Sequence, residues 1–138
     1  MNPDLIFQIS SAYVFLGWVA LFAAPEYTRT QNLVKSAIIV PLGLVYVFLV
    51  FYNIQDFNPM SFSSLSGVME LFQNDVAVLA GWIHYLVFDL FVGLYIVRSG
   101  IKAGIQRWKY TLCLPFTFMF GPFGLLLFWG MRATQKPK

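Results

Sequence analysis

The sequence predicts an all-α integral membrane protein, with four transmembrane helices and a short interfacial or re-entrant helix between the second and the third. Hydrophobic residues make up 59% of its 138 residues and charged residues only 11%, whereas soluble domains contain about 45–50% and about 25%. The hydrophobic residues also gather into four runs, each near the roughly 20 residues that cross a bilayer as a helix. These runs define a single membrane domain, residues 1–138, with spans at residues 5–24, 33–52, 76–97 and 111–131.

Composition also limits the partners and the compartment. The formal net charge is only +3, and no Lys/Arg-rich block is present, so we expect no nucleic acid partner. Cys113 is the only cysteine, which excludes an intrachain disulfide and a thiolate metal site. Residues 1–8 lack the basic region of a signal peptide and the composition of a transit peptide. We therefore expect a multi-pass protein of a bacterial inner membrane or a photosynthetic membrane, with the first run retained as a span.

The first run carries two kinds of polar or small residue. Ser10, Gly17 and Ala24 recur every seven residues and form a stripe of small side chains that permits close helix contact. Gln8 and Ser11 lie on a different side of the helix. They would either make hydrogen bonds to neighbouring helices or form one polar wall of an inner cavity.

Pro41 and Gly43 predict a kink or a loosened turn inside the second run. Proline has no N–H group, so it leaves a backbone carbonyl that a neighbouring group must satisfy. The connection that follows, residues 53–75, is too polar to span, but some of its apolar residues are spaced as one helical face. We expect a short helix there, capped by Ser63 or Ser64.

The fourth run contains Pro115 and a GPFG sequence at residues 121–124, which should break or sharply kink the helix. A broken helix survives in a bilayer only where protein or a cavity covers the freed backbone groups. The break is either a packing kink against a neighbouring helix or the wall of a binding cavity. In the second case Gly121 and Pro122 would contact the ligand.

Lys and Arg residues near the ends of the spans indicate the orientation, because cytoplasmic loops are enriched in them. The first and third loops hold six of them, namely Arg29, Lys35, Arg98, Lys102, Arg107 and Lys109. The C-terminal tail holds the other three, Arg132, Lys136 and Lys138. The charged residues of the second loop are all acidic, namely Asp56, Glu70 and Asp75. We expect the first and third loops on the cytoplasmic side and both termini on the other side.

The third run contains two ionisable residues in its interior, His84 and Asp89. Such residues are costly in a bilayer, so they usually face a bundle interior or a wet cavity and mark function. They lie about 140° apart around a helix axis. Trp82, Tyr85 and Gly93 share the face of Asp89, and Phe88 shares the face of His84. Both faces are interior only if this helix is central in the bundle.

These two residues have two interpretations. A buried carboxyl is favoured in its neutral form, so Asp89 could donate a proton while a neutral His84 accepted one. Alternatively, both side chains bond backbone or hydroxyl groups and specify the helix register. One histidine and one carboxylate are too few for a metal site, whose third ligand would have to come from Glu70 or Asp75. We therefore expect no metal.

Several segments resemble the abscisic-acid-deficient-4-like family of small four-span membrane proteins. The most specific one is WIHYLVFDLF at residues 82–91. The others are LGLVYVF (42–48), LSG (65–67) with Phe72, LCL (112–114) and GPFG (121–124). The resemblance covers nearly the whole chain. Because plant members of the family act as neoxanthin synthase, it implies a membrane protein of carotenoid biosynthesis that binds a carotenoid or another lipid-soluble molecule.

The resemblance implies a carotenoid isomerase that needs no cofactor. Opening an epoxide to form an allene requires an acid and a base, which we assign to Asp89 and His84. The expected substrate-binding residues are Trp82, Tyr85, Phe88, Gly93, Gln8, Ser11, Gly121 and Pro122. The alternative is a non-catalytic module or scaffold that binds carotenoid or lipid, as a monomer or a homo-oligomer. Leu94 favours the alternative or a changed substrate, because the family has an arginine there.

Overall fold

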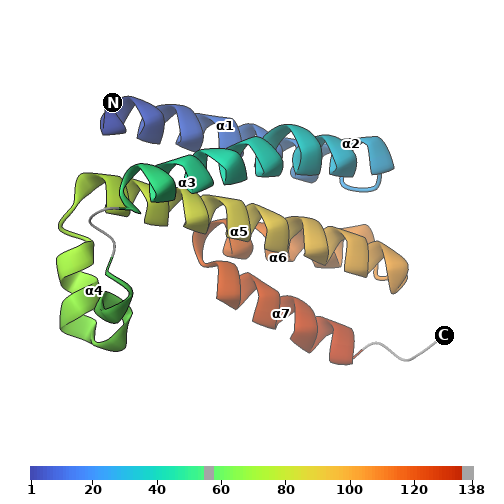
Figure 1. The fold of residues 1–138 in the computed structure, drawn as a ribbon. Coiled ribbons are helices and arrows are strands. Elements are labelled where there is room, and N and C mark those ends of the chain that lie inside the picture. The colour runs from blue at the N-terminus through green and yellow to red at the C-terminus, as the bar shows by residue number, and fades with distance from the viewer. Residues whose placement is uncertain (55–57, 135–138) are drawn as a thin grey trace.

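Three helical rods of this chain are long and apolar enough to cross a membrane. The computed structural model describes residues 1–54 and 58–134, and these rods are α1 (Pro3–Ala23), residues Thr28–Tyr52, and α5 (Asp75–Lys102). They confirm the first three predicted runs as long apolar helices, and they pack side by side (Figure 1). The described residues form helices and no strands. Three charged residues of the predicted loops and tail lie outside the described residues: Asp56, Lys136 and Lys138.

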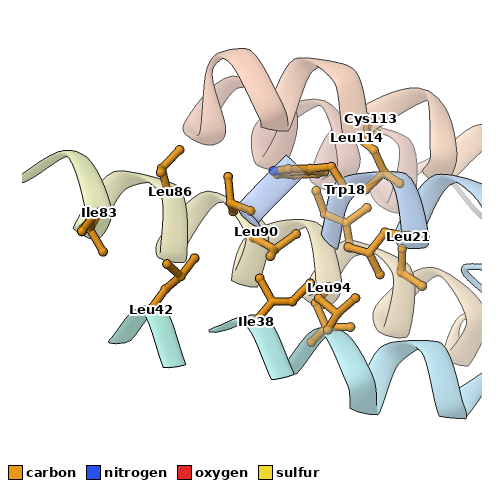
Figure 2. Close-up of a cluster of buried hydrophobic side chains, with 14 of the residues drawn as sticks. Trp18, Leu21, Ile38, Leu42, Ile83, Leu86, Leu90, Leu94, Cys113 and Leu114 are labelled. Carbon is orange, nitrogen blue, oxygen red and sulfur yellow. The ribbon is translucent and has the colours of Figure 1, made fainter. Parts of the chain in front are cut away.

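Helix α5 is central in the bundle, as the sequence predicts. It packs against α1 and α3 (Val40–Tyr52), and also against the two C-terminal helices α6 (Arg107–Met119) and α7 (Gly121–Ala133). Figure 2 shows Leu90 of α5 in the hydrophobic core beside Trp18 of α1. Gly17 permits this close approach, since a Cβ atom there would lie 2.7 Å from Leu90 Cδ2. The predicted small-residue position is thus a helix contact.

The second rod changes its helical geometry before Pro41. It consists of α2 (Thr28–Leu33), a π-helical segment η1 (Val34–Ile39) and α3. In an α-helix the carbonyl of Ala37 would accept a bond from residue 41, and proline has no N–H to give. The Tyr13 hydroxyl of α1 donates a hydrogen bond to this carbonyl instead. The prediction that a neighbour satisfies a freed carbonyl is confirmed.

The fourth predicted span is divided into two helices. Helix α6 ends at Met119, Phe120 adopts a non-helical conformation (φ −146°, ψ 67°), and α7 begins at Gly121. Each helix has 13 residues and is about 20 Å long, shorter than the roughly 30 Å of hydrocarbon. The predicted break at GPFG is therefore present, whereas a fourth continuous span is not confirmed.

Helices α6 and α7 form an antiparallel hairpin whose tip lies beside the middle of α5. The start of α7 adjoins Asp89, and further along, Phe128 packs edge-on against Tyr95 at 6.2 Å between ring centroids. Helix α7 therefore runs parallel to α5, while α6 runs back along it (Figure 1). A Cβ at Gly124 would lie 2.6 Å from Thr117 Cα, so glycine is needed where the two arms meet.

The hairpin returns the chain to the end of the molecule where α5 finishes. Arg98 of α5 donates hydrogen bonds to Gln31 and Asn32 of α2, so the first loop lies at this end too. The residues before the tail reach the same end, opposite the N-terminus (Figure 1). The prediction instead placed both termini on one side of the membrane. The difference arises because α6 and α7 together return the chain to the end of the bundle where α6 begins, whereas a single continuous span would have carried it to the other end.

The short helix predicted between the second and third rods is present as α4 (Leu65–Leu71). The Ser64 hydroxyl caps it by accepting a hydrogen bond from the Gly67 N–H at 3.1 Å, which confirms one of the two predicted caps. A 3-10 helix, η3 (Pro59–Ser63), precedes it and packs closely against it. Helices η3 and α4 lie at the end of the bundle where α5 begins (Figure 1).

Candidate functional site

Asp89 is buried where α5 meets the tip of the hairpin. Its residue is only 6% exposed. A Cβ at Gly121 would overlap the carboxyl group, and would lie 2.7 Å from its Cγ. The Gly121 N–H is directed to the carboxyl. Gly121 lies in the first turn of α7, and N–H groups in a first turn have no partner within their own helix. The broken fourth run thus brings unpaired backbone to the ionisable residue of the third.

The Tyr85 hydroxyl links Asp89 to the other arm of the hairpin. It lies 3.0 Å from the Met119 carbonyl oxygen and 3.4 Å from that of Phe118, both in the last turn of α6. It is also within hydrogen-bonding reach of the Asp89 carboxyl. A phenol has one proton, for which the α6 carbonyls and the Asp89 carboxyl are alternative acceptors.

One oxygen of Asp89 is left without a partner. The Oδ2 atom is buried and has no hydrogen bond within the described residues. Buried polar atoms normally have a partner, and an unpaired one calls for an explanation such as catalysis or a missing ligand. Gly121 and Tyr85 therefore engage the carboxyl group, while its Oδ2 atom has an unused hydrogen-bonding position.

Trp82 extends this site towards α1. Its indole N–H donates a hydrogen bond to the Ser11 hydroxyl at 3.0 Å, and its ring packs against Phe7 at 5.2 Å and Tyr85 at 5.5 Å between centroids. Ser11 therefore makes an interhelical hydrogen bond, one of its two predicted roles. The cluster of Asp89, Tyr85, Trp82, Ser11 and Gly121 is defined here as the hairpin-tip site.

His84 lies on a different face of α5, towards α3 and α4. Its ring stacks on Phe88 at 4.5 Å and packs against Tyr46 of α3 at 5.5 Å between centroids. It lines a cavity of about 460 Å³ between α3, α4 and α5. His84 and Asp89 lie apart in the structure. This follows from the angle of about 140° between their side chains around the axis of α5.

The remaining predicted residues are dispersed. Gln8 is exposed on α1, and its side chain makes no hydrogen bond within the described part of the chain. Gly93 is buried under Trp18, whose Cη2 would lie 2.7 Å from a Cβ there, so it serves helix packing. Pro122 is exposed in the first turn of α7. Leu94 is 3% exposed and belongs to the hydrophobic core.

Sequence reasoning missed two parts of these sites. The first part is the pair of carbonyls, of Phe118 and Met119, that accept hydrogen bonds from Tyr85. They are available because α6 ends before Phe120, and a pattern of side chains does not predict backbone acceptors. The cavity at His84 and a second, polar cavity beside it depend on how α4 folds against α3 and α5. The available signal was the row of asparagines and acids in residues 53–75, a segment whose pattern predicted only a polar connection with a short helix.

Fold and site together define a helical membrane protein with a carboxyl held at a helical hairpin. The ABA DEFICIENT 4-like family model matches residues 5–128, so the chain belongs to this family. It is 27% identical over 130 residues to Protein ABA DEFICIENT 4, chloroplastic, of Arabidopsis thaliana, covering 88% of this chain and 57% of that protein. The chain thus spans little more than half the length of that relative. No solved structure matches it.

Proposed function

We propose that this chain is a carotenoid-modifying membrane protein, and that it isomerises an oxygenated carotenoid at the hairpin-tip site. Membership of the family supports a carotenoid-related role. The observation that carries the reaction is the buried Asp89, whose Oδ2 has no partner while Tyr85 and Gly121 fix its position.

An isomerisation needs no net change in protons, so a single carboxyl can serve both halves of it. Neutral Asp89 protonates the oxygen of an epoxide as its C–O bond breaks. The carboxylate formed then takes the proton released from a carbon next to the cation, and the electron pair of that C–H bond becomes the new double bond. The products are an alcohol, an added double bond and a neutral Asp89, ready for another cycle.

This scheme assigns no chemical role to His84, which differs from the acid–base pair inferred from the sequence. The separation of the two residues also favours a second candidate function, a module that binds carotenoid or lipid without changing it. In that case Asp89 would orient the hairpin and hold a ligand hydroxyl. Both functions need the same lipid-soluble ligand, and they differ in whether the pigment leaves altered.

The test is expression in a bacterial host that makes an epoxy-carotenoid, followed by chromatography of the extracted pigments. The wild-type chain should convert part of the epoxide into an isomer of equal mass. Asp89→Asn keeps the shape and should lower conversion at least about 100-fold, the usual contribution of a general acid. Asp4→Asn, an exposed carboxyl near the N-terminus, is the control. Unchanged pigment with bound carotenoid in the wild type would select the binding module.

A further inference from the structure

Two cavities of opposite character adjoin at the end of the bundle where α4 lies. The larger, about 460 Å³, is mostly apolar, and the smaller, about 260 Å³, is lined mainly by polar residues. Asn53, the residue that ends α3, and Leu71 of α4 line both. The two cavities are therefore neighbours, an apolar and a polar compartment that meet at Asn53 and Leu71.

The apolar compartment is suited to a ring. Its walls include Phe72, the residue that ends α4, and Ala77 and His84 of α5. Gly81 makes room for the Phe72 ring, because a Cβ there would lie 2.7 Å from Phe72 Cε1. The volume falls within the range of about 300–1,000 Å³ that is typical of small-molecule pockets.

The polar compartment offers donors and an acceptor to a neutral group. Asn58 Oδ1 accepts a bond from the Met60 N–H, and Asn74 Oδ1 accepts bonds from the first turn of α5. The side-chain oxygen of each asparagine is thus engaged, whereas its side-chain N–H groups make no hydrogen bond within the described residues. Glu70 contributes a carboxylate, and among the described residues no Lys or Arg lines the compartment. A phosphate or carboxylate would be repelled there, whereas a hydroxyl could accept from an asparagine and donate to Glu70.

We propose that this two-part cavity binds the hydroxylated end ring of a carotenoid, with the ring beside His84 and the hydroxyl beside Glu70. The choice of a carotenoid rests on the proposed function. The site is distinct from the hairpin-tip site because it lies on another face of α5. His84 thereby has a role as an aromatic wall for the ring rather than as a base.

The test compares zeaxanthin with β-carotene, which share a carbon skeleton and differ only in the ring hydroxyls. Full-length Asp89→Asn protein in lipid nanodiscs is titrated with each pigment, and binding is followed by quenching of tryptophan emission. Zeaxanthin should bind about tenfold more tightly, the effect of a hydrogen bond to a charged group. Glu70→Ala should remove this preference. Gln73→Ala, an exposed neighbour outside both cavities, should keep it.

A second pair of variants tests the apolar compartment. Ala77→Phe places a ring inside it and should weaken the binding of both pigments at least tenfold, whereas Val78→Phe, on the exposed side of α5, should not. Equal affinity for the two pigments, or a preference that survives Glu70→Ala, would overturn the proposal. So would displacement of zeaxanthin by phosphatidylglycerol. Because the protein carries Asp89→Asn, these results are independent of whether the hairpin-tip site catalyses any reaction.

Discussion

Gly121 lies so close to Asp89 that no larger residue fits between the hairpin tip and the carboxyl. A Cβ atom at position 121 would lie 2.7 Å from Asp89 Cγ and 3.2 Å from Oδ2. Glycine is therefore required by the approach of two segments more than thirty residues apart in the chain. This contact couples the shape of the hairpin to the position of the one carboxyl buried in α5.

Gly121→Ala should separate the tip from Asp89 and lower both stability and pigment conversion. Overpacking of this kind costs about 1–3 kcal/mol, which thermal unfolding in detergent measures as a lower melting temperature. Gly130→Ala is the matched control in the same helix, since a Cβ there meets nothing within 4 Å. It should be neutral or slightly stabilising, because alanine favours helix. Equal melting temperatures for the two variants would contradict the contact.

Tyr13→Phe should destabilise the bundle by leaving the Ala37 carbonyl without a partner, at a cost of about 1–3 kcal/mol. The cost should fall when Pro41→Ala is added, because residue 41 then supplies an N–H group. A double-mutant cycle on melting temperature measures this coupling. Tyr27→Phe is the control, as that side chain is 69% exposed. Additive effects of Tyr13→Phe and Pro41→Ala would show that the hydroxyl does not replace the missing donor.

His84→Phe keeps an aromatic wall and removes the imidazole, and it should leave pigment conversion within about threefold of wild type, because His84 lies on a different face of α5 from Asp89. Chromatography of pigments from the epoxide-producing host measures it, with Asp89→Asn beside it as the inactive reference. A general base contributes at least about 100-fold. A loss of that size in His84→Phe would restore the acid–base pair.

The hairpin predicts that the C-terminal tail and the first loop lie on the same side of the membrane. Single cysteines replace Tyr27, Leu65 and Thr134 in a Cys113→Ala background, and a maleimide that cannot cross membranes is added to oriented vesicles. Residues 27 and 134 should react from one side and residue 65 from the other. A continuous fourth span would instead place residue 134 with residue 65. This side should be cytoplasmic, because Arg98, Arg107 and Arg132 gather there.

Much of the helical structure could be predicted because it depends on local chemistry. The apolar runs, the Ser64 cap and the disturbance at Pro41 each follow from residues that act within a few positions of themselves. The angle between His84 and Asp89 was equally readable, since it depends only on helix geometry. The neighbours of these two residues could not be predicted, because Tyr46 beside His84 and Gly121 beside Asp89 come from other helices.

The sequence by itself determined that this is an apolar, helical membrane protein whose last run breaks at GPFG, because composition and the loss of a backbone donor act locally. Only the tertiary structure decided what the chain does after the break. The same glycines and proline permit a kink or a reversal, and the choice depends on contacts made across the bundle. Gly124 lets α7 fold against Thr117, and Gly121 lets the resulting tip reach Asp89. Those two approaches convert an expected span into a hairpin that holds the carboxyl.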